Sequence, residues 1–303
     1  MAAGQIQLTR RRPWSERIIE ALLFAAASLG VVTTIGIIVL LAYQTIQFFA
    51  IVNPLDFLTG TVWSASIQPY RFGVLALVSG TLLVATIAMV IGTPLGLLSA
   101  ILLSEYSSNR VRNVVKPVLE TIAGIPTIVL GFFAINFLSP DVLKPIFGDD
   151  IGIFSALAGG IVVGILITPL IASISEDAMR AVPRGLREGA YAMGATKFEV
   201  VRKVVLPAAV SGVMASIVLA MSRAVGETMA VVLAVGTRPQ LTFNPLESVQ
   251  TMTAFIVQIT QGETSQGSVQ FLSLFAVAMV LFVITFALNL ASAWIVRRYR
   301  TAY

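Results

Sequence analysis

Two charged side chains, Arg223 and Glu227, stand inside an apolar stretch at 208–236. A charge at the centre of a bilayer is unfavourable by about 2.5–3.5 kcal/mol, so such a side chain normally faces a cavity or a partner. We expect the two residues to share one helix face, because they are four positions apart. The guanidinium group presents forked donors that suit an oxyanion. The pair predicts an anion-binding site, and an ion pair that only locks helix packing is the alternative.

The predicted helix is small and polar on the side of Arg223 and strongly apolar on the other side. The small residues on the first side are Ser216, Ala220, Ala230 and Ala234. This division is typical of a helix that lines a pathway.

A second candidate site is the polar, basic segment Glu188–Pro207, which separates two apolar runs. Gly194 permits a sharp turn between two short helices because it lacks a Cβ atom. Tyr191, Met193 and Phe198 would then be apolar anchors for a partner protein. By composition alone, the segment could equally be an amphipathic hairpin that lies on lipid headgroups.

The composition places these sites in a membrane protein. The chain has 303 residues, of which 57% are hydrophobic and 12% charged, whereas soluble domains carry about 25% charged residues. It contains no cysteine and no histidine, which excludes disulfides, thiolate chemistry and histidine-based catalysis within it. No GxxxxGK[ST] motif occurs, so ATP must be bound by another chain. No carboxylate pair suggests an enzyme, and no basic and aromatic surface stripe suggests nucleic-acid binding.

Six apolar stretches are long enough to span a bilayer. They are 18–43, 72–103, 117–138, 152–175, 208–236 and 271–296. Basic residues gather before the first stretch, after the second, after the fourth and after the last. Positively charged connections stay on the cytoplasmic side, so we expect both termini and the segment 176–207 to be cytoplasmic. The sequence predicts an N-terminal tail at 1–15 and one transmembrane domain at 16–303.

Two further features have ordinary structural explanations. Glu120 could favour the dipole of a first helical turn, pair with Lys116, or gate the inner mouth of a pathway. Glycines such as Gly92, Gly96, Gly160 and Gly164 favour close packing of membrane helices.

The spacing of Glu188, Gly189, Ala190, Gly194, Leu206 and Pro207 resembles the EAA loop of ATP-binding-cassette importer permeases. Gly189 stands where that loop usually has an alanine, and Val204 where it usually has isoleucine. Further stretches within 55–296 resemble the phosphate-specific branch, the Pst family. They are DFLTGTVW, GTLLVATIAMVIGTPLGLLSAILLSEY, KPVLETIAGIPTIVLGFF and RAVGETMAVVLAVG.

The resemblance implies an all-α integral membrane protein with six transmembrane helices, in the type I ABC importer (MetI-like) fold. Its first helix would be an addition to a five-helix core and would pack against a partner subunit. Glu188, Gly189, Ala190, Tyr191, Gly194, Leu206 and Pro207 would couple the chain to an ATPase. Arg223 and Glu227 match the intramembrane charged pair of the family and would bind substrate.

The implied function is a permease subunit, without enzymatic activity or a cofactor of its own, for phosphate import across the bacterial plasma membrane. The implied partners are a second permease subunit (PstA-like), two ATP-binding subunits (PstB-like) that hold ATP and Mg²⁺, a periplasmic or lipid-anchored phosphate-binding protein (PstS-like) and the lipid bilayer. A permease for sulfate or molybdate, and a non-transporting scaffold or sensor of phosphate signalling, are the alternatives.

Overall fold

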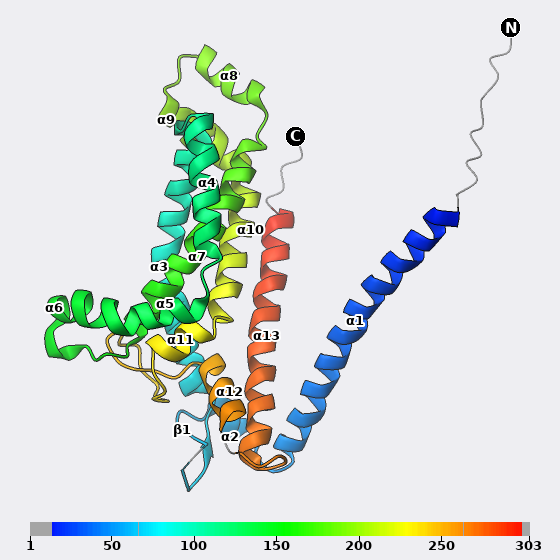
Figure 1. The fold of residues 1–303 in the computed structure, drawn as a ribbon, viewed down its shortest axis with the longest axis vertical. Helices are drawn as coiled ribbons and strands as arrows, with labels where there is room; N and C mark the ends of the chain where they lie inside the picture. The colour runs from blue at the N-terminus through cyan, green and yellow to red at the C-terminus, as the bar shows by residue number, and fades with distance from the viewer. Residues whose placement is uncertain (1–13, 66, 263, 299–303) are drawn as a thin grey trace.

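The computed structural model describes residues 14–65, 67–262 and 264–298, and these are mostly helical (Figure 1). Six helical runs are long and apolar enough to cross a membrane: Glu16–Phe49, Leu75–Tyr106, Thr127–Asp150, Ala156–Arg180, Lys197–Val225 and Val269–Trp294. The chain is therefore an all-α, multi-pass membrane protein, as the sequence predicts. Residues 1–13 of the predicted N-terminal tail lie outside the described residues, and the first helix begins at Trp14.

Most connections between the elements are short, but 60–74, which holds the two strands, and 235–251 are long. The α-helices are α1 (Trp14–Phe49), α2 (Pro54–Thr59), α3 (Leu75–Ile101), α4 (Asn109–Ala123), α5 (Thr127–Phe133), α6 (Lys144–Phe147), α7 (Ala156–Arg180), α8 (Arg184–Ala192), α9 (Lys197–Val200), α10 (Leu206–Val225), α11 (Met229–Ala234), α12 (Met252–Gln261) and α13 (Val269–Arg298). Strands β1 (Trp63–Ser64) and β2 (Arg71–Phe72) form an antiparallel hairpin. Segments of π-helix at Leu102–Tyr106, Ala134–Leu143 and Val201–Val205 and a 3₁₀ turn at Gly148–Asp150 complete the set.

Helices α3 and α7 form the centre of the bundle, and glycines set their separation. A Cβ atom on Gly92 would lie 2.6 Å from Ile167 Cγ1 and 2.8 Å from the carbonyl oxygen of Gly164. A Cβ atom on Gly160 would lie 2.5 Å from Ile87 Cβ. These contacts confirm the prediction that the glycines serve close helix packing.

The end of the bundle opposite α8 and α9 in Figure 1, which we call the outer end, is closed by aromatic rings. Phe48 at the end of α1, Phe57 of α2 and Phe72 of β2 pack edge to face with centroid separations of 5.4 Å. Trp63 of β1 lies 4.8 Å from the ring of Phe255 in α12. Such T-shaped pairs add stability beyond the buried area, so this cluster fixes the hairpin onto α12.

Helix α1 leaves the bundle at an angle, and only its C-terminal part touches α13 (Figure 1). The hydroxyl of Thr45 donates to the carbonyl oxygen of Phe275 over 3.2 Å. Over residues 16–44, by contrast, no residue of α1 is buried within this chain. A helix of 36 residues with an apolar surface on all sides needs lipid or another subunit around it.

The third predicted span, 117–138, differs from the observed helices. Ser108 caps α4, so this helix begins at Asn109 and not at Pro117, which lies inside it. Gly124 ends α4, and Pro126 precedes α5. Proline alone does not end a helix here, since Pro117 lies inside α4. The two helices are separated by the Gly124 C-cap together with Pro126, whose ψ of 127° is not helical. The apolar run is therefore Thr127–Asp150.

The fifth predicted span, 208–236, is also displaced. Helix α9, the π-helical segment Val201–Val205 and α10 join into one continuous run, Lys197–Val225, which ends at Gly226. The helical run therefore begins within the predicted loop 176–207, and it stops before Glu227.

Candidate functional site

Arg223 and Glu227 lie on either side of a break between α10 and α11. Arg223 is in the last turn of α10, and Gly226 caps that helix with its N–H on the carbonyl oxygens of Ser222 and Ala224. The prediction that the two charges share one continuous helix face is therefore wrong, because the helix ends between them. In the described part of the chain no ion pair within 4.0 Å joins them, so a packing ion pair is not what the structure shows.

Their environments differ sharply. Arg223 is exposed on the surface of this single chain, and its guanidinium has no hydrogen-bond partner among the described residues. Glu227 is only 8% exposed. The N–H of Ala230 donates to Glu227 Oε1 over 3.4 Å, and the hydroxyl of Thr253 donates to the Glu227 carbonyl oxygen over 2.8 Å. Thr253 in α12 thus satisfies a backbone carbonyl group that the helix break leaves without a partner. No sequence pattern indicates this contact.

The small residues expected to line a pathway instead pack within the bundle. Ser216 and Ala220 are fully buried, and Ser216 Oγ lies 2.7 Å from Ser175 Oγ of α7. Arg223 shares its side of α10 with Leu219, which is 49% exposed. The surface available to a ligand or partner is consequently the one that carries Arg223.

The predicted elbow of two short helices is confirmed. Helix α8 ends at Ala192, Gly194 takes a φ of +83°, and α9 begins at Lys197. That backbone conformation favours glycine. Thr196 and Glu199 form a reciprocal capping box at the start of α9, which fixes the direction of the second helix.

The residues predicted to contact an ATPase lie mostly on the surface of this elbow. Tyr191, Met193 and Phe198 are 43%, 85% and 62% exposed. The remaining predicted coupling residues divide into exposed Glu188, Gly189, Gly194 and Pro207, half-buried Leu206 and buried Ala190. Large exposed apolar side chains on a polar loop are typical of a protein-docking surface.

Arg187 fastens α8 to the bundle. Its guanidinium donates to the carbonyl oxygens of Val182 and Met179, at 2.6 and 2.7 Å, and to Glu105 Oε1 at 3.0 Å. These contacts satisfy carbonyl groups at the end of α7 that have no hydrogen-bond donor within the helix. Lys197 of α9 also lies over the ring of Tyr106, 4.8 Å from its centroid. The elbow is therefore held to the end of α3 by one ion pair and one cation–π contact.

A cluster of charges that sequence reasoning did not single out joins α4 to α7; we call it the α4–α7 cluster. Glu176 is fully buried and accepts from Arg112 Nε at 2.6 Å and from Lys116 Nζ at 2.8 Å. Lys116 also pairs with Asp177 at 2.6 Å. The sequence does contain an indication of this cluster: Glu176 and Asp177 lie side by side at the end of an apolar stretch, and charges in such a position need partners.

The cluster also excludes one of the alternatives for Glu120. Lys116 is engaged by Glu176 and Asp177, so its predicted pairing with Glu120 is wrong, and Glu120 instead accepts a long contact of 3.4 Å from Ser173. The hydrogen bond to Glu176 raises the pKa of Arg112. Burial opposes the charge of Lys116, but hydrogen bonds to Asp177 and Glu176 outweigh it and raise its pKa. Arg112 and Lys116 therefore keep their charge at neutral pH.

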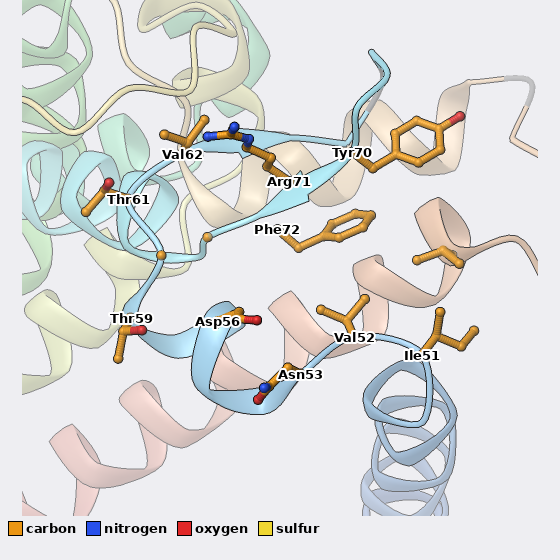
Figure 2. A pocket seen from close by; sticks show the side chains of 13 residues that line it. Ile51, Val52, Asn53, Asp56, Thr59, Thr61, Val62, Tyr70, Arg71 and Phe72 are labelled. Atoms are coloured by element: carbon orange, nitrogen blue, oxygen red, sulfur yellow. The ribbon is translucent and has the colours of Figure 1, made fainter.

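The outer end carries a pocket of about 650 Å³ between α2 and the β1–β2 hairpin (Figure 2). Its polar lining includes Asn53, Asp56, Thr59, Tyr70 and Arg71. The end of α1 and the start of α13 complete it through Ile51 and Val269. The elements α2 and β1 beside this pocket lie at the end of the molecule opposite α8 and α9 (Figure 1).

Known proteins match both the sequence and the fold. Residues 92–301 match the family "Binding-protein-dependent transport system inner membrane component". The "Probable ABC transporter permease protein YqgH" of Bacillus subtilis is 36% identical, with 86% of this chain and 84% of the relative covered. The "Phosphate transport system permease protein PstC" of Mesorhizobium japonicum is 30% identical over 95% of this chain and 92% of its own.

Among solved structures, a bacterial alginate ABC transporter matches 96% of this chain and 100% of its own, with a TM-score of 0.66 and 16% identity. The MetNI methionine ABC transporter, in an inward-facing conformation, covers 75% of this chain and 94% of its own, with a TM-score of 0.55 and 22% identity. At these identities the likeness establishes the fold alone.

The fold and the elbow define a transmembrane permease subunit of an ATP-binding-cassette importer. The chain belongs to the family of binding-protein-dependent transport system inner membrane components, in the branch of the PstC phosphate permeases. It is thus a multi-pass inner-membrane protein that works with an ATPase and a substrate-binding protein, and ATP hydrolysis is the task of the ATPase.

Proposed function

We propose that this chain forms half of the membrane pathway of an ATP-driven importer of inorganic phosphate, with Arg223 and Glu227 as its contacts to the substrate. The observation that carries the site is the break after Val225. Exposed Arg223, which has no ion pair among the described residues, lies on one side of it, and buried Glu227 lies on the other. Non-helical backbone at membrane depth is tolerated where it lines a cavity or is covered by protein. The relatives named PstC support phosphate as the cargo.

The two side chains divide the recognition of phosphate. Arg223, exposed and without a partner in the described chain, attracts the oxyanion and donates to it. Glu227 has one long contact of 3.4 Å to its carboxylate, so acceptor capacity remains for the P–OH group of protonated phosphate. A fully deprotonated oxyanion has no such donor and would be repelled by the carboxylate.

The elbow supplies the connection to ATP. Its exposed residues Tyr191, Met193 and Phe198 would dock on a PstB-like ATPase. The second helix of the elbow belongs to the continuous run Lys197–Val225, which carries Arg223 in its last turn. A rigid-body movement of the elbow would therefore displace the anion contact directly, since no loop intervenes.

The remaining partners follow from surfaces that this chain leaves open. The apolar span of α1, unburied here, suits a PstA-like second permease, and the outer end suits a PstS-like phosphate-binding protein. The start of α1 and the end of α13 point towards the end that carries the elbow (Figure 1), which supports cytoplasmic termini.

Uptake of radiolabelled phosphate by the reconstituted complex tests the site. Arg223→Ala should lower kcat/KM about 100-fold, because a lost charge-assisted contact is worth about 1.5–3 kcal/mol, and Glu227→Gln should relax discrimination against sulfate. Lys144→Gln is the control, since Lys144 is an exposed cation 3.8 Å from Asp149. Wild-type uptake by both site variants in fully assembled complexes would refute the assignment. ATPase stimulation by sulfate or molybdate, but not by phosphate, would refute the cargo.

A further inference from the structure

A pocket of about 350 Å³ lies where α8 meets the ends of α3 and α7, and we call it the elbow pocket. Its lining consists of Ser104, Glu105, Arg180, Arg184, Arg187, Glu188 and Tyr191. The four lining residues of α8 follow one another in steps of three, one and three positions, so they share one helix face. In Figure 1, α8 lies at the end of the molecule opposite α2 and β1. One face of α8 therefore borders the elbow pocket.

The charges in the lining do not balance. Glu105 is matched by Arg187, whose Nη2 lies 3.0 Å from Glu105 Oε1. The hydroxyl of Ser104 donates to the same oxygen over 2.8 Å, so this carboxylate is already well satisfied. Three arginines and two glutamates line the pocket in all. One positive charge is therefore left over, and an occupant with a single negative charge would balance it.

Two of the arginines have donors that are free for such an occupant. Arg184 is exposed, and its guanidinium has no ion pair and no hydrogen bond among the described residues. Arg180 Nε lies 3.7 Å from Glu176 Oε1, which is too long for a hydrogen bond. That oxygen already accepts from Arg112 Nε at 2.6 Å. The elbow pocket thus has an available guanidinium on α8 and another on α7.

The chemistry of these side chains favours a phosphate group. A guanidinium fork matches two oxygen atoms of a phosphate, and the contacts are charge-assisted. The hydroxyl of Tyr191 adds a donor that has no hydrogen-bond partner among the described residues. Glu188, which also lines the pocket, would repel a doubly charged phosphate more strongly than a singly charged one. Phosphodiesters and dihydrogen phosphate carry one negative charge, so both suit the lining.

We propose that the elbow pocket binds a singly charged phosphate group, which bridges Arg184 of α8 to Arg180 of α7. Two sources supply this chemistry, the phosphodiester of an anionic phospholipid headgroup and dihydrogen phosphate in solution. The apolar spans Leu75–Tyr106 and Ala156–Arg180 end beside the pocket, which places it near the level of the headgroups. The bridge fastens the elbow to the bundle whatever the transporter carries, so this inference does not rest on phosphate import.

Hydrogen–deuterium exchange of the assembled complex tests the site, with the amides of Arg184–Ala192 as the readout. The first probe is inorganic phosphate, added to complexes in phosphatidylcholine nanodiscs and compared with sodium chloride of equal ionic strength. The second probe is phosphatidylglycerol, which replaces part of the phosphatidylcholine in nanodiscs without added phosphate. At about ten times its Kd, the ligand should raise the protection of α8 about tenfold. A response to the first probe supports a free anion as the source, and a response to the second supports the lipid headgroup.

Matched variants show whether the response comes from the elbow pocket. Arg184→Gln removes the unpaired guanidinium and should weaken binding of the active probe at least about tenfold. Arg184→Lys keeps the charge but loses the fork, so it should keep part of the response. Arg110→Gln is the control, because Arg110 is an exposed arginine at the start of α4 that does not line the pocket, and its response should equal that of the unchanged protein.

Two results would overturn the proposal. One is exchange of α8 that ignores both probes, and the other is an equal response in Arg184→Gln and in the unchanged protein. Arg223→Ala complexes should respond as the unchanged protein does, because Arg223 lies at the far end of α10 from the elbow. The elbow pocket can therefore fail while the proposed anion contact holds, and the reverse is equally measurable.

Discussion

Replacement of Glu176 by glutamine tests the reasoning about the α4–α7 cluster most directly. The change keeps the shape of the side chain and removes its charge, so Arg112 and Lys116 lose the carboxylate that lies 2.6 and 2.8 Å from them. Helix α4 buries no residue of its own. Its attachment to α7 therefore depends on these contacts more than on apolar packing.

The magnitude follows from burial. Removal of one partner of a buried ion pair costs about 3–5 kcal/mol. The side chains of Arg112 and Lys116 are 22% and 19% exposed, and Lys116 keeps Asp177 at 2.6 Å, so solvent and the second carboxylate offset part of the loss. We expect α4 to be destabilised by about 2–3 kcal/mol, which is about a 30- to 150-fold increase in local opening.

Hydrogen–deuterium exchange in lipid nanodiscs measures this opening, with the amides of Asn109–Ala123 as the readout. Lys144→Gln breaks an exposed pair, at 3.8 Å with side-chain exposures of 60% and 100%, and should change nothing in α4. Folding raises the pKa values of Arg112 and Lys116, so their charged forms stabilise the fold at any pH below their ordinary pKa values. For Lys116 this contribution is lost only as the pH rises above about 10.5. Protection of α4 in the unchanged protein, corrected for intrinsic exchange, should therefore be constant from roughly pH 6 to 9. Wild-type exchange of α4 in Glu176→Gln would refute the ionic attachment.

Three further substitutions test other contacts. Arg187→Ala should loosen α8 and weaken co-purification of the ATPase, because Glu105, with a side chain 6% exposed, loses its cation; unchanged exchange of α8 would contradict this. Gly194→Ala should destabilise the elbow by about 1 kcal/mol, since its φ is +83°, and lower phosphate-stimulated ATPase activity. Gly185→Ala is its control, because a Cβ atom there has no neighbour within 4 Å in this chain and Gly185 is not among the predicted coupling residues. Gly92→Ala should lower the thermal unfolding midpoint by overpacking α3 against α7, at about 1–3 kcal/mol, and an unchanged midpoint would contradict the glycine contacts.

Local chemistry explains which predictions hold. The elbow is predictable because Gly194, the Thr196–Glu199 capping box and the exposed apolar residues act within a few positions of one another. Ser108 sets the start of α4 in the same way. The prediction missed it because the span at 117–138 was placed by its apolar residues alone. A hydropathy window averages over caps and breaks, so it finds a span more reliably than it finds the ends of a helix.

The candidate site shows the opposite case. The residue types Arg223 and Glu227 indicate an anion contact, but their spacing suggested a single helix face that Gly226 interrupts. A helix can continue through such a glycine or end there, and the outcome depends on whether a distant group can satisfy the freed backbone. Here the hydroxyl of Thr253 donates to the carbonyl oxygen of Glu227. Sequence patterns do not contain that contact, because the two residues meet only when α12 packs against the break.

The sequence by itself determined the membrane class, the number of spans and the docking elbow, because hydrophobicity, charge and turn chemistry are properties of short segments. Only the tertiary structure decided which charges are paired. It joined Glu176 to Arg112 and Lys116, left Arg223 exposed, and enclosed the Trp63 N–H without an acceptor among the described residues. The stability and reactivity of a charge or a donor depend on burial and on partners brought together by folding, and these are set by packing between segments far apart in the chain.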